Sequence, residues 1–443
     1  MTVVERLSES RGALISKLRD RRASVAIFGC GYVGLPLTVA AVDAGFSVVG
    51  FDVDATKISR LRTGHSTVDD VDDERLTAAV NSGCLRFVSK ATSLGAADVN
   101  VIAVPTPLRD AVPDLSAVVA ASRTIGKQLQ PGVLVVLEST TYPGTTDELV
   151  RPILEEASGL RAGFDFALGY APERISPGDG RDLRSVPRVV GGVDGPSTEC
   201  AAVFYEALVG EVYRSQSCRE AEMAKLIENT FRQVNIALVN ELTTVAHTLG
   251  VDIWDALAAA STKPYGYMSF WPGPGVGGHC IAVDPSYLSW RVESQLGFGL
   301  GFVQQARAIN NRMPSYVASR IQRLLNDASL PVRGACVHVV GVGYKPGLAD
   351  IRESPALAVI EELLANGAVV TYSDPHVRRI DVAGQMLRHR ALDATLSEDT
   401  VDVVVLLAAE LDTDVDAIAR AVPRVFDAQG LTRTRRPQGV TRL

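Results

Sequence analysis

The sequence predicts an α/β protein in which two doubly wound parallel-sheet domains are joined by a helical middle domain. The first observation is a strand–helix–strand unit: an apolar strand over Val25–Phe28, a glycine turn, an apolar helix over 35–44 and a second strand over 47–52. The second is the return of this pattern after Pro331, from Cys336 to Asp374. The third is the loss of strand signals between about 215 and 315, where helical periodicity takes over.

The remaining elements extend each part in order. Further apolar strands are expected at 99–104, 133–137 and 166–169, so the first sheet should reach about residue 205. Long helices are expected over 220–249 and 284–310. The second unit reads as a strand over 336–340, a turn over 341–344, a helix over 355–365 and a strand over 369–374.

These elements predict five segments, with ligands at the carboxyl ends of both sheets. They are an N-terminal extension (1–22), a first Rossmann-like domain (23–210), a helical central domain (211–325), a second Rossmann-like domain (326–430) and a basic tail (431–443). We expect the tail to be solvated, because a run of charge at a terminus usually is.

Composition excludes several classes of protein. A net charge of −7, from 44 basic and 51 acidic residues, argues against nucleic acid as a partner. The longest apolar runs, such as Val403–Ala409, fall short of the roughly 18 residues of a membrane helix, and residues 1–22 lack the apolar core of an export signal. We therefore expect a cytoplasmic protein without membrane contact. Six scattered cysteines without metal-ligand spacing predict free thiols and no bound metal.

The glycine turn is a complete GxGxxG, Gly29 to Gly34, placed directly after a strand and opening a helix. Glycines there let the backbone approach a pyrophosphate at the positive end of the helix. Asp52 closes the second strand, where its carboxylate can accept hydrogen bonds from a ribose 2′-hydroxyl and repel a 2′-phosphate. The pattern predicts a dinucleotide, NAD rather than NADP; the alternative is a glycine turn that binds no nucleotide.

Cys280 follows a glycine-rich loop, 273–278, and is expected at the start of a helix. The helix dipole and free amides there stabilise a thiolate, which makes Cys280 a candidate nucleophile. Asp284 lies four residues later on the same helical face and could act as a base. The alternative is a buried, inert thiol.

Lys225 and Asn229 are also four residues apart on a predicted helix with a largely apolar surface. An ammonium and an amide that project together could stabilise a developing oxyanion. The alternative is a solvated polar face, and spacing alone favours that alternative.

Together these motifs resemble the nucleotide-sugar 6-dehydrogenase family, the relatives of UDP-glucose dehydrogenase. The resemblance covers most of the chain and is carried by an ordered series: Gly29–Gly34 with Leu35-Pro36, Val104–Pro107, Glu138–Thr140, Ala171–Arg174, Lys225–Asn229, Gly277–Cys280 with Asp284, Gly343–Lys345 and Asp350–Ser354.

The resemblance implies a four-electron oxidation of a sugar CH2OH to a carboxylate with two NAD⁺. By carry-over, Cys280 forms a thiohemiacetal and then a thioester, and Lys225 and Asn229 stabilise the oxyanions. Asp284 and Thr140 position a water used in proton transfer, and Glu173 serves the hydrolytic step.

Contacts to ligands are implied in the same way. The residues expected at NAD are Gly29, Gly31, Tyr32, Val33, Gly34, Asp52, Lys57, Thr106 and Arg352. The residues expected at the nucleotide sugar are Gly275, Gly277, Tyr344 and Lys345, with Lys263 as the cation nearest to an arginine of the family. The Gly-Gly-His-Cys form resembles the branch acting on UDP-N-acetylhexosamines and TDP- or UDP-glucose, so base and hexose stay open. His279 is expected to be structural.

Two other functions remain open. Two-electron β-hydroxyacid dehydrogenases also carry a lysine and an asparagine four apart on a helix, but they need neither the cysteine nor a third domain. A non-catalytic NAD-sensing protein would have no reason to keep Cys280, Lys225 and Asp284 together. The long central helices also predict a homodimer or a higher homo-oligomer.

Overall fold

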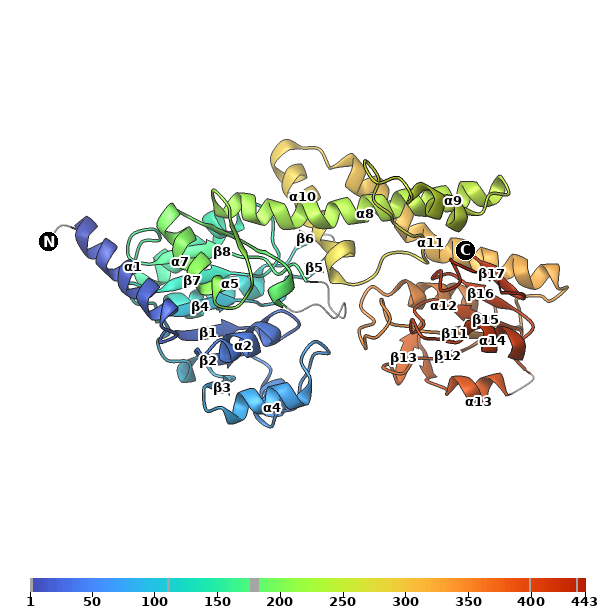
Figure 1. Ribbon diagram of the computed structural model, residues 1–443, viewed down its shortest axis with the longest axis horizontal. Helices are drawn as coiled ribbons and strands as arrows, with labels where there is room; N and C mark the ends of the chain where they lie inside the picture. The colour runs from blue at the N-terminus through green and yellow to red at the C-terminus, as the bar shows by residue number, and fades with distance from the viewer. Residues whose placement is uncertain (1–2, 110–111, 176–182, 398–399, 436) are drawn as a thin grey trace. The chain divides into compact units, whose positions relative to one another are not determined.

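The computed structural model describes residues 3–109, 112–175, 183–397, 400–435 and 437–443, without the side chains of residues 3–10, 279 and 280 (Figure 1). The chain forms two compact units, Met1–Glu228 with Trp290–Gly297, and Asn229–Ser289 with Phe298–Leu443. Helices α8 (Cys218–Thr248) and α10 (His279–Leu296) contribute residues to both units. The division into five segments stays a prediction.

The first unit is built on an eight-stranded sheet of order β10-β9-β8-β7-β4-β1-β2-β3. The strands are β1 (Ser24–Phe28), β2 (Ser47–Phe51), β3 (Leu85–Val88), β4 (Val99–Ile102), β7 (Leu134–Leu137), β8 (Ala167–Tyr170), β9 (Arg188–Gly192) and β10 (Val212–Arg214). All neighbours pair in parallel except β8 and β9. The predicted doubly wound parallel sheet is therefore confirmed, with one antiparallel pairing that the sequence did not indicate.

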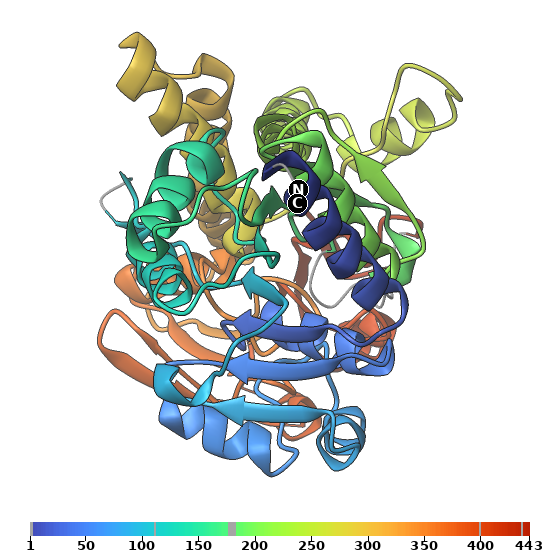
Figure 2. The ribbon, with the colours of Figure 1, turned by 90° about the vertical axis from the view of Figure 1, so that its left-hand side faces the viewer.

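Helices cover both faces of this sheet, so its central strands β1, β4, β7 and β8 are almost fully buried. They are α2 (Gly34–Asp43), α3 (Ala55–Arg62), α4 (Asp73–Asn81), α5 (Ser116–Gly126), α6 (Arg151–Ser158) and α7 (Gly195–Glu206). The N-terminal extension forms α1 (Val3–Arg19), which packs against α7 (Figure 2). Leu14 and Leu18 of α1 are buried in the core.

The helical part contains α8, α9 (Ile253–Ala260), α10 and α11 (Gly301–Asp327). The helix expected over 220–249 is confirmed as α8. The single helical stretch expected over 284–310 is wrong, because α10 ends at Leu296 and α11 starts at Gly301. Gly297 has a φ of +74°, a left-handed conformation that ends a helix. Within the described residues, no helix is long and apolar enough to cross a membrane.

The second unit holds a five-stranded parallel sheet of order β12-β11-β15-β16-β17. Its strands are β11 (Cys336–Val340), β12 (Val369–Ser373), β15 (Val403–Leu406), β16 (Val425–Asp427) and β17 (Val440–Arg442), and its helices are α12 (Pro355–Ala365), α13 (Leu392–Leu396) and α14 (Val415–Ala421). The strand predicted at 336–340 and the helix predicted at 355–365 match β11 and α12.

The expectation of a solvated basic tail is wrong. β17 adds to the sheet edge beside β16, and Leu443 is only 4% exposed. Thr432 is buried and donates hydrogen bonds from its amide and hydroxyl to Asp427. Two of the tail's arginines form ion pairs, Arg435 with Asp416 and Arg442 with Asp252. Backbone pairing and apolar burial therefore outweigh the charge of the segment.

Candidate active site

The glycine turn between β1 and α2 leaves space for a ligand at the N-terminus of α2. Gly29 has a φ of +99°, and a Cβ there would lie 2.3 Å from the carbonyl oxygen of Ala103. A Cβ on Gly34 would lie 1.8 Å from the carbonyl oxygen of Gly29, whereas a Cβ on Gly31 would meet nothing within 4 Å. The backbone of this turn therefore has no space for a side chain at Gly29 or Gly34, whereas the open space at Gly31 leaves room for a ligand. The first turn of α2, after Tyr32 and Val33, has no side-chain cap, so its amides can bind a pyrophosphate.

Asp52 lies beside this turn, at the residue that follows β2. Its Oδ2 accepts hydrogen bonds from the amide of Cys30 at 3.0 Å and from Lys57 Nζ at 2.9 Å, and its Oδ1 accepts from the amide of Asp54 at 3.0 Å. Burial alone would raise the pKa of Asp52, but the hydrogen bonds from Lys57 and the two amides lower it. The carboxylate is therefore ionised where the ribose of a dinucleotide is expected.

The Asp52–Lys57 pair gives a prediction about cofactor choice. Wild-type protein is expected to prefer NAD strongly over NADP, because a 2′-phosphate would face the Asp52 carboxylate. Asp52→Ser is expected to raise the ratio of kcat/KM for NADP to that for NAD by about 10-fold or more, since Lys57 would be freed to pair with the phosphate. Asp54→Asn keeps the cap of α3 and serves as the control. Equal kcat/KM for both cofactors in the wild type would contradict this selection.

The loops after β4 and β7 are joined at the carboxyl edge of the same sheet. Thr106 donates its hydroxyl to the carbonyl of Thr140 at 2.9 Å, and Ser139 donates to the carbonyl of Val104 at 2.7 Å. Thr106, predicted at NAD, and Thr140, predicted at the reacting water, therefore lie in directly bonded loops.

A buried charge cluster lies next to these loops. Arg188 on β9 donates Nη1 to Glu138 at 3.1 Å and Nη2 to Glu173 at 2.7 Å, and Tyr205 donates its hydroxyl to Glu138 at 2.6 Å. Burial raises the pKa of Glu138 to about 7, with the charge of Arg188 opposing the rise. For Glu173, burial also raises the pKa, but Arg188 and the amides of Ile175 and Arg174 lower it overall. Glu173 is therefore ionised at neutral pH.

Lys225 on α8 is hydrogen-bonded to the backbone of Glu173, a member of this cluster. Its Nζ donates to the carbonyl oxygen of Glu173 at 2.6 Å, and the residue is 6% exposed. Asn229, one turn later, is 4% exposed. Burial of both residues excludes the alternative of a solvated polar face, although it leaves their catalytic roles as predictions.

Arg188 and Tyr205 were not predicted as site residues. Glu138 appears in a recognised motif, but Arg188 and Tyr205 follow it by 50 and 67 residues, on β9 and α7. The sequence hinted at this cluster only through Arg188, a single arginine at the start of an apolar strand. The partners of Arg188 are brought to it by tertiary packing, so sequence patterns do not reveal them.

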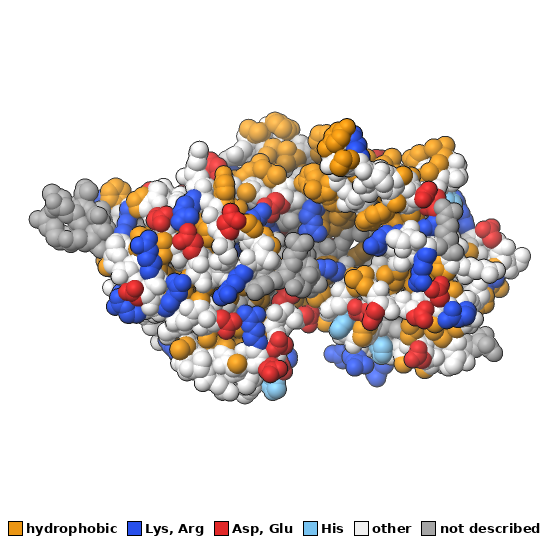
Figure 3. Space-filling model, in the orientation of Figure 1, with side chains coloured by type: hydrophobic (Ala, Val, Ile, Leu, Met, Phe, Trp, Pro, Cys, Tyr) orange, Lys and Arg blue, Asp and Glu red, His pale blue; other side chains and the backbone are white. Residues whose placement is uncertain are grey.

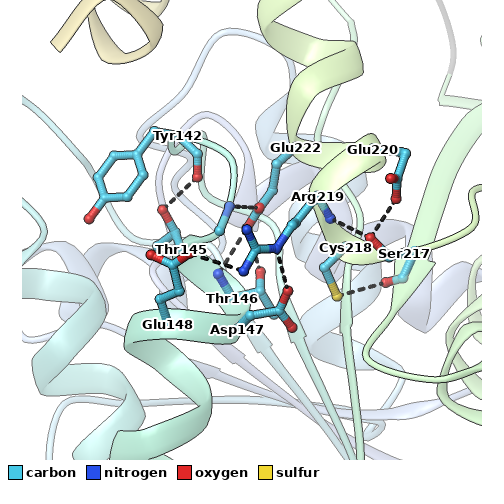
Figure 4. A network of polar contacts seen from close by, with 12 residues as sticks. Tyr142, Thr145, Thr146, Asp147, Glu148, Ser217, Cys218, Arg219, Glu220 and Glu222 are labelled. Carbon is cyan, nitrogen blue, oxygen red and sulfur yellow. Dashed lines mark hydrogen bonds and ion pairs between the residues drawn. The ribbon is translucent and has the colours of Figure 1, made fainter. Parts of the chain in front are cut away.

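Glu222, one turn before Lys225, ties α8 to the segment after the Thr140 loop (Figure 4). Its Oε2 accepts from the amide of Gly144 at 2.5 Å, and its Oε1 accepts from the amide and hydroxyl of Thr146 at 2.8 and 2.7 Å. Arg219 pairs with Asp147 and Glu148 at 3.2 and 3.0 Å. Burial raises the pKa of Glu222 to about 7, although the hydrogen bonds from Thr146 and Gly144 oppose the rise.

The raised pKa of Glu222 predicts a pH-dependent stability. The folded state favours the neutral carboxyl of Glu222. The contribution of this group to the free energy of unfolding is therefore fully present below its ordinary pKa of 4.5 and is lost as the pH rises through about 7. Glutamine cannot ionise, so only the wild type loses this stability as the pH rises. The Tm of Glu222→Gln minus the Tm of wild type should therefore increase by roughly 5 °C from about pH 5 to about pH 8. Thermal melts across this range measure the difference, with the exposed Glu220→Gln on the same helix as control. Parallel Tm profiles for wild type and Glu222→Gln would contradict the assignment.

The predicted nucleophile lies in the second unit. α10 begins at His279, which confirms that Cys280 stands in the first helical turn; the side chains of both residues lie outside the described part of the structure. Asp284 is buried, and its Oδ2 accepts a hydrogen bond from Asn229 Nδ2 at 2.6 Å. Two of the predicted site residues, Asn229 and Asp284, are therefore brought together.

The glycine loop before α10 packs against the turn that follows β11. A Cβ on Gly277 would lie 2.7 Å from Tyr344 Cβ, and one on Gly278 would lie 2.8 Å from Tyr344 Cε2. A Cβ on Gly275 would lie 3.0 Å from Pro355. Gly275, Gly277 and Tyr344, all predicted at the nucleotide sugar, thus share one region of the second unit.

The three predicted cations of this unit differ in their surroundings. Lys345 is half-buried in the turn after β11. Arg352 bonds to Asp350 through its amide, Nε and Nη2 at 2.6–3.1 Å, and its side chain is 55% exposed. Lys263 is exposed, with its ammonium 5.1 Å from the centre of the Tyr265 ring. Their ligand contacts stay predictions.

Asp374, after β12, is the counterpart of Asp52 in the second sheet. Its Oδ2 accepts from the amide of Val342 at 2.9 Å, and its Oδ1 accepts from the amides of His376 and Val377 at 2.9 and 3.0 Å. Backbone amides therefore hold both oxygens, whereas Asp52 also binds a lysine. The turn after β11 therefore repeats the backbone fold of the turn after β1. Among the described residues, it lacks the carboxylate–lysine pair that Asp52 and Lys57 place where a ribose is expected.

Comparison with known proteins agrees with this geometry. Models of the UDP-glucose/GDP-mannose dehydrogenase family match three regions: the NAD binding domain over 23–213, the central domain over 219–312 and the UDP binding domain over 338–433. A UDP-N-acetyl-D-glucosamine 6-dehydrogenase of Pseudomonas aeruginosa is 39% identical over 362 residues, 81% of this chain and 84% of that protein. A UDP-N-acetyl-D-mannosamine dehydrogenase of Pyrococcus horikoshii is 37% identical over 357 residues, 80% of this chain and 84% of that protein.

Solved structures extend the similarity to the whole fold. A UDP-D-ManNAc dehydrogenase from Pyrococcus horikoshii matches with a TM-score of 0.84 and 32% identity, over 95% of this chain and 98% of that one. A UDP-glucose dehydrogenase from Pyrobaculum islandicum matches with a TM-score of 0.81 and 29% identity, over 94% of this chain and 96% of that one. The chain belongs to the UDP-glucose/GDP-mannose dehydrogenase family, and its first domain is the NAD-binding domain of that family.

Proposed function

We propose that this chain oxidises the C6 hydroxymethyl group of a UDP- or TDP-hexose to the uronic acid, in two successive two-electron steps. The observation that carries the proposal is the pair of buried contacts made by α8, Lys225 to Glu173 and Asn229 to Asp284. Family membership and relatives named as UDP-N-acetylhexosamine dehydrogenases support the class of substrate.

Cys280 is proposed as the nucleophile of the second step. NAD⁺, when bound at the glycine turn, accepts one hydride in each oxidation. The thiolate adds to the aldehyde carbon from the first oxidation to give a thiohemiacetal, whose oxidation leaves a thioester. Water then replaces the sulfur, which releases the carboxylate and restores the thiol. The aldehyde stays bound throughout.

The other residues are proposed to handle charge and protons. Lys225 and Asn229 stabilise the oxyanions of the thiohemiacetal and of thioester hydrolysis. Asp284 and Thr140 position the water used in proton transfer. Glu173, which Arg188 keeps ionised, accepts a proton from the hydrolytic water.

The nucleotide sugar is proposed to bind at the UDP-binding domain and the glycine loop. The backbone at Gly275 and Gly277 allows close approach of the diphosphate, and Tyr344 and Lys345 contact the nucleotide. Lys263 supplies a further positive charge, and Arg352 contacts NAD.

A homodimer in the cytoplasm is the proposed form of the protein. One face of α8 carries an exposed apolar stripe at helical spacing, made of Ile227, Phe231, Leu238, Leu242 and Val245, and the exposed Leu249 follows directly after the helix. Apolar side chains gather over this helical region (Figure 3). Burying the stripe against a second copy would remove it from water. Light scattering should then give twice the 47.2 kDa of the chain, and a monomer at micromolar concentration would contradict the dimer.

Incubation with NAD⁺ and a panel of nucleotide sugars tests the function. The panel contains UDP-glucose, UDP-N-acetylglucosamine, UDP-N-acetylmannosamine and TDP-glucose, and absorbance gives the NADH formed. We expect two NADH for each sugar consumed. One NADH would indicate the two-electron alternative, which the comparisons do not favour, and none with any sugar would indicate a non-catalytic protein.

A further inference from the structure

A proline interrupts the hydrogen bonding of α10 beside the predicted nucleophile. Pro285 lies inside α10, directly after Asp284. Proline has no N–H, so the carbonyl of Ile281, four residues earlier, loses its helical donor. Ile281 follows Cys280 directly. The carbonyl without a helical partner therefore belongs to the turn that carries the nucleophile.

Gln233 on α8 supplies the missing donor. Its Nε2 donates to the carbonyl oxygen of Ile281 at 3.2 Å, and the residue is 2% exposed. Asn229, one turn earlier on α8, donates to Asp284 at 2.6 Å. Two amides four residues apart thus hold the backbone and the carboxylate of the same turn of α10.

Gln233 is itself part of a buried chain of amides. Asn310 on α11 donates Nδ2 to the backbone carbonyl of Gln233 at 3.3 Å, and its Oδ1 accepts from Asn240 Nδ2 at 2.9 Å. Asn240 Oδ1 accepts from the amide of Gly273 at 3.0 Å. The segment with the nucleophile is therefore bonded to α8 at both of its ends, Gly273 and Ile281.

We propose that Gln233 is a positioning residue for the turn that carries Cys280 and Asp284, because it replaces the N–H that Pro285 lacks. The proposal rests on the proposed function, in which Cys280 is the nucleophile. Because Pro285 has no N–H, a side chain of α8 rather than the backbone of α10 orients this turn. α8 is also the helix that carries Lys225 and Asn229. The same helix thus holds this turn twice, through Gln233 at the carbonyl of Ile281 and through Asn229 at the carboxylate of Asp284.

Gln233→Met tests the proposal by removing the donor while keeping an unbranched side chain of similar length. Gln233 Oε1 has no partner among the described residues, so the substitution removes one side-chain bond. We expect kcat to fall on the order of 10- to 100-fold, because small misplacements of reacting groups are this costly. KM for NAD should stay unchanged, since the glycine turn is untouched. Asn235→Leu, whose amide bonds to Phe231 within α8, is the matched control.

A double-mutant cycle with Pro285→Ala separates positioning from a general loss of packing. Alanine restores a backbone N–H that can donate to Ile281, so Gln233→Met should cost little in the Pro285→Ala background. An equal loss of kcat in both backgrounds would overturn the proposal. If Gln233→Met alone fails to fold, the double variant must fold and turn over at the rate of Pro285→Ala; its failure to do so would also overturn it.

Alkylation of Cys280 by iodoacetamide gives a readout that needs no substrate. We expect Gln233→Met to change the pH profile of the alkylation rate and Pro285→Ala to restore it. Unchanged alkylation together with wild-type kcat in Gln233→Met would refute the positioning role. If no nucleotide sugar is oxidised, the alkylation cycle still decides whether Gln233 positions this turn, so failure of the proposed function is distinguishable.

Discussion

Replacing Cys280 by serine is expected to stop the reaction after the first oxidation, with a loss of complete turnover on the order of 10³-fold or more. Serine keeps the volume, but its hydroxyl is much less acidic than a thiol, and an alkoxide is a far poorer leaving group than a thiolate. In the proposed mechanism the first oxidation needs no covalent bond to the protein, whereas the second does. The yield should therefore fall from two NADH per sugar toward one.

Mass spectrometry provides the second measurement on Cys280→Ser. A slowly hydrolysed ester would appear as a mass increase on the peptide that contains residue 280. Cys84→Ser, at an exposed free cysteine, is the matched control and should turn over normally. Formation of the sugar acid by Cys280→Ser at the wild-type rate, with two NADH, would require the covalent mechanism to be abandoned.

The fold was largely predictable because strand and helix periodicities are local. β11 and α12 fall at their predicted residues, and the glycine turn places β1, α2 and β2 with errors of one residue. The tail was misjudged because its charge is visible in the sequence, whereas the pairing of β17 with β16 depends on a free sheet edge. The break at Gly297 was missed because helical periodicity continues on both sides of it.

The motif residues of the site were predictable from the sequence, but the residues that hold them in place were not. Asn229 and Asp284 are recognisable from spacing and motif, and the structure bonds them directly. Arg188 gave no comparable signal, because its partners Glu138 and Glu173 come from separate loops. Gln233 acts through a carbonyl that only Pro285 makes available, and such a pairing is visible only once α8 and α10 are packed.

Replacing Lys225 by alanine is expected to lower kcat by on the order of 10²-fold or more, because a buried ammonium that we propose stabilises the oxyanion is lost. In the structure its ammonium donates to the carbonyl of Glu173 at 2.6 Å, so the charge is held beside the predicted hydrolytic base. Lys225 also lowers the pKa of Glu173, after the larger effects of burial, Arg188 and the neighbouring amides. Steady-state kinetics with saturating NAD⁺ and nucleotide sugar measure the loss.

Two further variants separate charge from packing at this position. Lys225→Met keeps most of the side-chain volume and should lose as much activity as alanine, because the ammonium provides the stabilisation. Lys127→Ala, at an exposed lysine that follows α5, should leave kcat unchanged. A shared loss in Lys225→Ala and Lys225→Met, with intact thermal melts, assigns the effect to charge. Wild-type turnover in folded Lys225→Met would mean that the bond to Glu173 is structural and that other groups stabilise the oxyanion.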